Sequence, residues 1–125
     1  MLFLDMKKLL LTLFFTLFAF QVYALELLMA HNPACNVCQK FIEEVAVDYN
    51  NSEEAKTLPL IIISVYDQPE WFKEAYHENR IKRISGTPTF IVWNGRKELS
   101  RLVGYTNKEN FMKRINIYIS EWEMR

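Results

Sequence analysis

The sequence predicts an α/β fold in which a mixed four-stranded sheet is flanked by about three helices. Strand-like and helix-like runs alternate along the chain, two later strand-like runs are joined by a short turn, and the last segment is an amphipathic helix. A parallel strand–helix–strand unit followed by an antiparallel hairpin and a covering helix gives such a sheet. With 125 residues, of which 50% are apolar, the chain is long enough for one packed core.

The charge balance argues against a nucleic-acid partner. Lys plus Arg and Asp plus Glu each number 15. Proteins that bind a phosphate backbone usually carry clustered excess positive charge, which this composition does not suggest. The sequence shows no internal repeat and no low-complexity linker, so we expect a single folded domain that acts as a monomer.

The first 24 residues have the composition of a targeting segment. Lys7 and Lys8 precede an uncharged run of 17 residues from Leu9 to Leu25, and Val22-Tyr23-Ala24 places small residues at the positions that signal peptidases read. We predict that residues 1–24 are a secretory signal peptide and that residues 25–125 form the exported domain. A retained membrane anchor is the alternative, because a spanning helix needs at least about 17 apolar residues.

The exported domain begins with a strand and a helix on either side of a cysteine pair. The apolar run Leu25–His31 predicts a buried strand, which Pro33 ends. From Val37 onward, apolar residues recur at helical spacing as far as Tyr49, so we expect an amphipathic helix that ends near Asn50. The second cysteine of the pair therefore lies in the first turn of this helix.

The next two elements are a strand and a helix. Residues 59–65 are continuously apolar and rich in β-branched side chains, which is typical of a central strand covered on both faces. A helix should follow, with Asp67 or Gln68 as its cap and Pro69 in its first turn. Its buried stripe is expected to contain Trp71, Phe72, Ala75 and Tyr76.

The last three elements are a hairpin and a helix. The strand-like runs 89–93 and 98–103 are joined through Asn94-Gly95, which tolerates the positive φ angles of a type I′ turn. The closing helix should begin at Thr106-Asn107-Lys108-Glu109, which has the pattern of a capping box. Its apolar face would contain Phe111, Met112, Ile115, Tyr118, Ile119 and Trp122.

The reactive chemistry of this chain is carried by Cys35 and Cys38. A helix N-terminus stabilises an anion by up to about 2 kcal/mol, and one pKa unit corresponds to about 1.4 kcal/mol. A thiol just before the helix could therefore ionise near pH 7 instead of at its usual pKa of about 8.5. We assign Cys35 as the nucleophile and Cys38 as the thiol that resolves the mixed disulfide. The expected redox group is a Cys35–Cys38 disulfide, with no other cofactor.

Two other uses of the cysteines are weaker hypotheses. A stapling disulfide would close a very short loop and would stabilise the fold little. A zinc site would need His31, Cys35, Cys38 and His77 as ligands, and their spacing matches no familiar zinc pattern.

Thr87-Pro88-Thr89 is the second informative motif. Proline at the start of a strand is tolerated only at special positions, and an X-Pro bond can be cis at a modest cost. Together with the cysteine pair, this motif resembles the thioredoxin superfamily, and in particular the SoxS-type periplasmic thioredoxins of sulfur-oxidation clusters. The resemblance covers residues 25–125 and includes Leu28-Met29, Cys35-x-x-Cys38-x-x-Phe41, Pro59-Leu60, Thr87-Pro88-Thr89-Phe90-Ile91-Val92 and Gly95-Arg96-x-Glu98-x-x-Arg101-x-x-Gly104-Tyr105.

The resemblance implies a minimal thioredoxin fold and a periplasmic thiol-disulfide oxidoreductase. It implies that Pro88 is cis and faces the cysteines, and that the backbone of Thr87 pairs with an extended substrate segment. The partners would be proteins that carry a reactive thiol or disulfide. The direction would be reductive, with electrons supplied by a membrane thiol relay.

The chain also departs from ordinary thioredoxins. They carry a buried carboxylate where this chain has Met29, a Trp where it has Ala34, and Gly-Pro where it has Asn36-Val37. We therefore expect a narrower range of clients. His31, Asn36 and Val37 are candidate modulators of the site, although His31 is also well placed to cap the strand end and face solvent.

A function without catalysis is the alternative hypothesis. The sheet edge near Pro88 would then hold a partner without exchange, or the two thiolates would carry a metal ion. An assay of protein-disulfide reduction distinguishes an oxidoreductase from a partner-binding module or a metal carrier.

Overall fold

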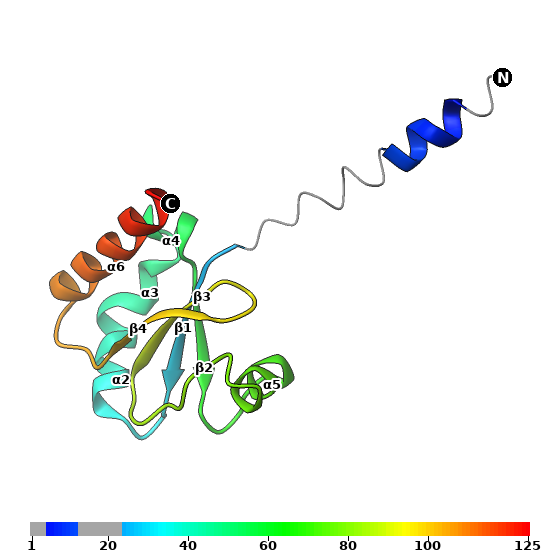
Figure 1. Ribbon diagram of the computed structural model, residues 1–125. Helices are drawn as coiled ribbons and strands as arrows, with labels where there is room; N and C mark the ends of the chain where they lie inside the picture. Colours follow the sequence, from blue (N-terminus) through cyan, green and yellow to red (C-terminus); the bar gives the residue numbers. More distant parts are fainter. Residues whose placement is uncertain (1–4, 13–23) are drawn as a thin grey trace.

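The computed structural model describes residues 5–12 and 24–125. Residues 5–12 are helical, and none of the described helices is long and apolar enough to cross a membrane. Residues 1–4 and 13–23 of the predicted signal or anchor lie outside the described residues, so this assignment stays a prediction. The elements from residue 26 onward (Figure 1) are β1 (Glu26–His31), α2 (Asn36–Phe41), the π-helical segment η1 (Ile42–Ala46), α3 (Val47–Tyr49), α4 (Glu54–Thr57), β2 (Leu60–Ser64), α5 (Glu70–His77), β3 (Thr89–Trp93), β4 (Glu98–Val103) and α6 (Lys108–Glu123).

The four strands form one mixed sheet in the order β2-β1-β3-β4. Strand β1 pairs parallel with β2 and antiparallel with β3, and β4 pairs antiparallel with β3. Helix α5 covers one face of the sheet, while α6 and the segment from α2 to α3 cover the other (Figure 1). This architecture confirms the predicted sheet. The short helix α4 was not predicted.

The strand β2 lies at the edge of the sheet, so the expectation that residues 59–65 form a central strand is wrong. Its only strand partner within the described residues is β1. Leu60 and Ile63 are buried on opposite faces, but Ile62 is 42% exposed. A continuous apolar run indicates that both faces of a strand are covered, but it does not indicate how many strands lie beside it. Strands β1 and β3 are the two inner strands, and all five residues of β3 are buried.

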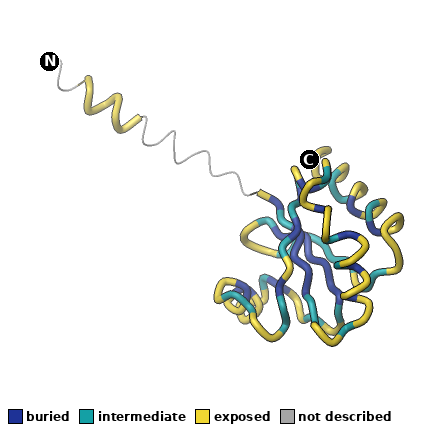
Figure 2. Tube along the Cα trace, turned by 180° about the vertical axis from the view of Figure 1, so that it is seen from behind, coloured by how far each residue is buried: buried dark blue, intermediate teal, exposed yellow. Residues whose placement is uncertain are grey.

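Two apolar cores lie on the two faces of the sheet. Figure 2 shows that the buried residues gather in the strands at the centre of the domain. On the α6 face, the ring of Phe41 lies 4.6 Å from that of Phe90 and 4.8 Å from that of Phe111, measured between centroids. On the α5 face, Phe72 and Ala75 belong to the same buried cluster as Ile91 and Trp93 of β3. Trp71 and Tyr76 are exposed, so the buried stripe of α5 is narrower than predicted.

The β3–β4 connection is not a type I′ turn. Asn94 does not have a positive φ angle, which that turn would require, whereas Gly95 has a φ of 88°. Residues 94–97 form the loop, in which the Asn94 side-chain oxygen accepts hydrogen bonds from the N–H groups of Arg96 at 2.9 Å and Lys97 at 2.8 Å. The Asn94 side chain therefore organises a longer turn of the Asx type.

Two helix starts also differ from the prediction. Asn107, not Thr106, caps α6, because its Oδ1 accepts a hydrogen bond from the N–H of Asn110 at 2.8 Å. Asn is the stronger N-cap of the two residue types, so it displaces the expected capping box by one residue. Pro69 occupies the cap position of α5, without a side-chain hydrogen bond to the helix.

The side chain of Asn50 ties the end of the first long helical segment to β2. Its Oδ1 accepts a hydrogen bond from the Leu60 N–H at 2.9 Å, and its Nδ2 donates to the Leu60 carbonyl at 3.2 Å. The amide thus pairs with the backbone of an edge strand much as a neighbouring strand would. The hydroxyl of Tyr49 supports the same connection by donating to the Leu58 carbonyl at 2.8 Å.

We predict that Asn50→Ala lowers the free energy of unfolding by about 1 to 3 kcal/mol, because two hydrogen bonds to one backbone unit are lost. Urea unfolding of the reduced protein should show a lower midpoint with an unchanged slope. Asn51→Ala, at an exposed neighbouring position, is the matched control and should leave the midpoint in place. Equal midpoints for Asn50→Ala and the parent protein would contradict the assignment.

Candidate active site

A tight turn after β1 delivers Cys35 to the start of α2. The Oδ1 of Asn32 accepts a hydrogen bond from the Ala34 N–H at 2.9 Å, and its carbonyl accepts from the Cys35 N–H at the same distance. Cys35 is the N-cap of α2, with an extended backbone at φ −89° and ψ 114°. Its Sγ accepts a hydrogen bond from the Cys38 N–H at 3.2 Å. A sulfur atom thus fills the role that a Ser or Asp oxygen usually has at a helix start.

The two cysteines differ sharply in burial. Cys35 is partly exposed, whereas Cys38 is 0% exposed and belongs to the core on the α6 face. Both are free thiols in this structure and lie close together. Of the two, only Cys35 can therefore be reached by a protein substrate without a change in the fold.

The environment of Cys35 favours its ionised form. Burial raises the pKa of Cys35, but hydrogen bonds outweigh this effect and bring the pKa below its ordinary value. The strongest of them come from the thiol and then the N–H of Cys38, followed by contributions from Thr87 and the Val37 N–H. A thiolate at this position is the attacking form in disulfide exchange.

The environment of Cys38 has the opposite effect. Burial raises the pKa of Cys38, and the hydrogen bond with Cys35 and the negative charge on Cys35 raise it further. Hydrogen bonds from the backbone of Asn32 and the side chain of Thr87 oppose this shift without overcoming it. Cys38 therefore stays protonated under conditions in which Cys35 ionises.

The loop before β3 forms the other side of the site. The Thr87–Pro88 peptide bond is cis, the isomer that the resemblance implies. The Sγ of Cys35 lies 3.5 Å from the Thr87 carbonyl oxygen, although the two residues are 52 positions apart in sequence. Pairing of Ala30 with Thr89 between β1 and β3 explains this proximity, because it places the end of β1 beside the start of β3.

The candidate modulators differ in their relation to the cysteines. Asn36 is exposed at the first position of α2, and Val37 is 41% exposed and contributes its N–H to the Cys35 site. His31 is partly buried, and its Nδ1 is buried without a hydrogen-bond partner among the described residues. The expectation that the His31 side chain faces solvent is therefore wrong for this atom. His31 is not among the groups that shift the pKa of either cysteine.

The structure does not assemble the four residues considered as zinc ligands. Within residues 5–12 and 24–125, no group of three or more His, Cys, Asp or Glu side chains is placed to hold a metal ion. His31 ends β1, whereas His77 ends α5, which packs on the face of the sheet opposite the Cys38 core. The described part of the chain thus offers only the two cysteines as neighbouring soft ligands.

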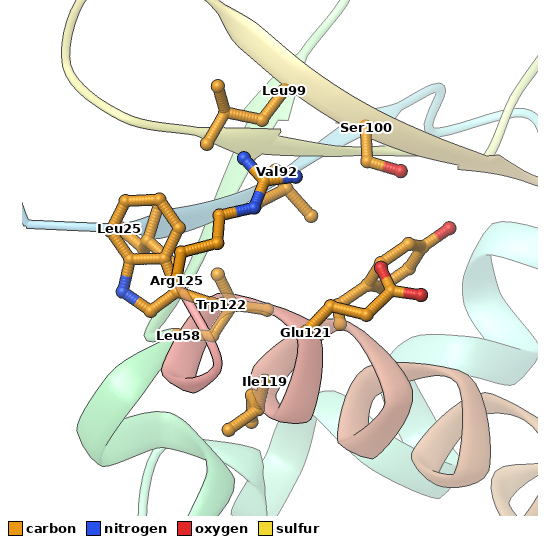
Figure 3. A pocket seen from close by; sticks show the side chains of 10 residues that line it. Leu25, Leu58, Val92, Leu99, Ser100, Ile119, Glu121, Trp122 and Arg125 are labelled. Carbon is orange, nitrogen blue, oxygen red and sulfur yellow. The ribbon is translucent and has the colours of Figure 1, made fainter.

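A small apolar pocket lies away from the cysteines (Figure 3). Side chains from β3, β4 and the end of α6 surround a cavity of about 40 Å³ next to Leu25, at the end of β1 opposite Cys35. Sites for small molecules usually measure about 300 to 1,000 Å³. This pocket is too small for such a ligand.

Asn32 is a site residue that the sequence analysis missed. Its hydrogen bonds shape the turn that presents Cys35. Its backbone also makes a hydrogen bond that opposes the upward shift in the pKa of Cys38. The Asn-Pro pair at Asn32-Pro33 was a signal for it, because Asn before a turn often accepts a hydrogen bond from the backbone two residues later.

Residues 24–118 match the family model described as a thioredoxin-like domain. Among solved structures, the periplasmic thioredoxin SoxS from Paracoccus pantotrophus, in its reduced form, is similar, with 27% identity, coverage of 77% of this chain and 96% of that chain, and a TM-score of 0.63.

Two thioredoxins share the fold at lower identity. The protein from Thermus thermophilus is 23% identical over 77% of this chain and 74% of its own, with a TM-score of 0.55. The thioredoxin from Malassezia sympodialis is 16% identical over 75% of this chain and 76% of its own, with a TM-score of 0.57. A search of curated proteins finds no match. Because the family model spans most of the sequence, the chain belongs to the thioredoxin-like family.

Proposed function

We propose that this protein is a thiol-disulfide oxidoreductase that exchanges disulfides with protein partners through Cys35 and Cys38. One observation carries the proposal: a partly exposed Cys35 caps a helix beside the Thr87 carbonyl, while a fully buried Cys38 donates its N–H to the Cys35 sulfur. This arrangement separates an attacking thiol from a protected resolving thiol, as dithiol exchange requires.

The exchange proceeds in two balanced steps. The thiolate of Cys35 attacks one sulfur of the client disulfide, the client S–S bond breaks, and the other client sulfur leaves as a thiolate that takes up a proton. Cys38 then loses its proton and attacks the Cys35 sulfur, which releases the first client sulfur and forms the Cys35–Cys38 disulfide. The client gains two electrons and this chain loses two.

The binding of the client would use the backbone beside Pro88. Thr87 is partly exposed next to Cys35, whereas Pro88 is buried and its carbonyl accepts a hydrogen bond from the Gly104 N–H at 2.8 Å. An extended client segment can pair with the partly exposed backbone at Thr87, a form of strand addition. Such pairing would hold the client disulfide over the Cys35 sulfur.

The reductive direction and the periplasmic location are parts of the same proposal. They are supported by the similarity to a periplasmic thioredoxin and by the predicted signal at residues 1–24. Each turnover leaves this chain oxidised, so reduction of clients needs an outside dithiol, which we propose is a membrane thiol relay. A few specific clients fit better than many, since Met29 and Ala34 replace two residues of general thioredoxins.

We predict that Cys38→Ser traps a client as a mixed disulfide in the native host, because the resolving thiol is missing. Non-reducing gels should show a higher-mass band that dithiothreitol removes. Cys35→Ser should give no such band, and both variants should lower insulin reduction to background. A band that persists in Cys35→Ser would reverse the roles of the two cysteines.

Insulin reduction by the parent protein is the control for the whole proposal. A protein that only binds partners, or only carries a metal ion, would show no turnover with dithiothreitol as the electron source. Absence of turnover, together with a disulfide that stays closed in a strongly reducing glutathione buffer, would overturn the enzymatic function.

We further predict that Cys35 reacts with iodoacetamide at a lower pH than Cys38. The rate follows the thiolate fraction, so modification of Cys35 should reach half its maximum at a lower pH than that of an ordinary free cysteine, because its pKa is lowered. Modification of Cys38 should stay slow at that pH, because its pKa is raised and its side chain is buried. Fragmentation mass spectrometry of the reduced parent protein can assign each site. Equal rates at the two sites would contradict the pKa difference.

A further inference from the structure

A buried ion pair on β4 faces the segment that leads to the active-site loop. The side chains of Glu98 and Arg101 are 4% and 22% exposed, less than the partners of any other ion pair within the described residues. The guanidinium binds the carboxylate through two contacts, Nε to Oε1 at 2.5 Å and Nη2 to Oε2 at 3.1 Å. This fork geometry fixes both side chains.

A bulge in β4 places the two side chains on one face of the sheet. Residues three apart on a regular strand point to opposite faces. In β4 the register shifts by one residue, so that Val92 pairs with Ser100 while Trp93 pairs with Glu98. Arg101 pairs with Ile91, which is on the same face of β3 as Trp93. The bulge thus turns Glu98 to the face of Arg101.

The ion pair holds the backbone of residues 80–83, which lie between α5 and β3 outside any strand. Arg101 donates to the carbonyls of Arg83 at 2.9 Å and Lys82 at 3.0 Å. Glu98 accepts from the Lys82 N–H at 3.0 Å through its carboxylate, and its own N–H donates to the Arg80 carbonyl at 2.8 Å. Four backbone groups of one irregular segment are therefore satisfied from β4.

The held segment ends at the substrate-binding loop. Three residues, 84–86, separate Arg83 from Thr87. On the other side of Thr87, the Gly104 N–H holds the Pro88 carbonyl at 2.8 Å, and the Thr89 hydroxyl donates to the Gly86 carbonyl at 2.6 Å. The loop that carries Thr87 is thus anchored on both sides: the Glu98–Arg101 pair of β4 forms the upstream anchor, and Gly104, the residue after β4, forms the downstream anchor.

We propose that Glu98 and Arg101 are positioning residues that fix the Thr87–Pro88 loop for client binding. The inference rests on the proposed function, in which the backbone at Thr87 receives an extended client segment. A loop that is already ordered loses less conformational entropy when the client binds, so the client binds more tightly. The ion pair does not touch Cys35, and its effect is on binding of a protein disulfide and not on the intrinsic reactivity of the thiolate.

The test uses Arg101→Lys, which keeps the positive charge but cannot form the fork or bind both carbonyls. We expect the KM for a protein disulfide to rise about five- to tenfold, with a much smaller change in kcat. Hydrogen–deuterium exchange in the reduced full-length protein should become faster in peptides covering residues 82–88. Alkylation of Cys35 by iodoacetamide, measured at a pH where the thiol is fully ionised, should stay within about twofold.

Two control variants separate positioning from general loss of stability or charge. Asn50→Ala lowers stability at a distance from this loop and should leave KM unchanged. Lys56→Met removes one cation and breaks the exposed pair with Glu53, and it should also leave KM unchanged.

Each outcome has a distinct meaning. An unchanged KM and unchanged exchange in Arg101→Lys would overturn the inference, and so would a rise in KM that Asn50→Ala reproduces. If the parent protein does not reduce protein disulfides, the proposed function fails. In that case, faster exchange at residues 82–88 would still show that the pair orders the loop, and unchanged exchange would overturn that as well.

Discussion

The hydrogen bond from the Cys38 N–H to the Cys35 sulfur is the interaction on which the site depends. It caps α2, and so it determines where the helix begins and which way Cys35 points. A neutral thiol is a weak acceptor, whereas a thiolate accepts a charge-assisted bond that is roughly twice as strong. The start of the helix is therefore better capped when Cys35 is ionised. The same bond therefore sets the start of α2 and lowers the pKa of Cys35.

Strand pairing brings the Thr87–Pro88 loop close to the Cys35 sulfur. Because β1 runs antiparallel to β3, the strand that ends before Cys35 lies beside the strand that begins after Pro88. The inner position of β3 buries all five of its residues, so this junction is built on buried backbone. The segment before β3 lies outside the strands, and it is held by hydrogen bonds from Arg101 of β4 and from Gly104, the residue after β4. The Cys35 turn and the Thr87–Pro88 loop are thus both positioned by the same sheet.

Much of this arrangement could be predicted from the sequence, because periodicity and turn residues report local structure directly. The strand and helix ranges, the mixed sheet and the place of Cys35 before a helix all follow from such patterns. The edge position of β2 could not be predicted, since a run such as 60–63 reports burial and not pairing. Competition between adjacent capping residues decided the start of α6 in favour of Asn107. The Glu98–Arg101 pair escaped prediction because a bulge, invisible in the sequence, brings residues three apart to one face.

In the proposed exchange, the state of Cys35 would determine when Cys38 reacts. Burial raises the pKa of Cys38, and the hydrogen bond with Cys35 and the negative charge on a Cys35 thiolate raise it further, so the buried thiol keeps its proton while Cys35 is ionised. Formation of the mixed disulfide removes that charge and also ends the need for Cys38 to donate a hydrogen bond to an anion. Two of the three causes that raise the pKa of Cys38 would then be lost, at the step in which Cys38 attacks. Met29, a fully buried neighbour in the same core, offers no carboxylate to take the proton, so in the proposed exchange the protonation of Cys38 depends on the state of Cys35.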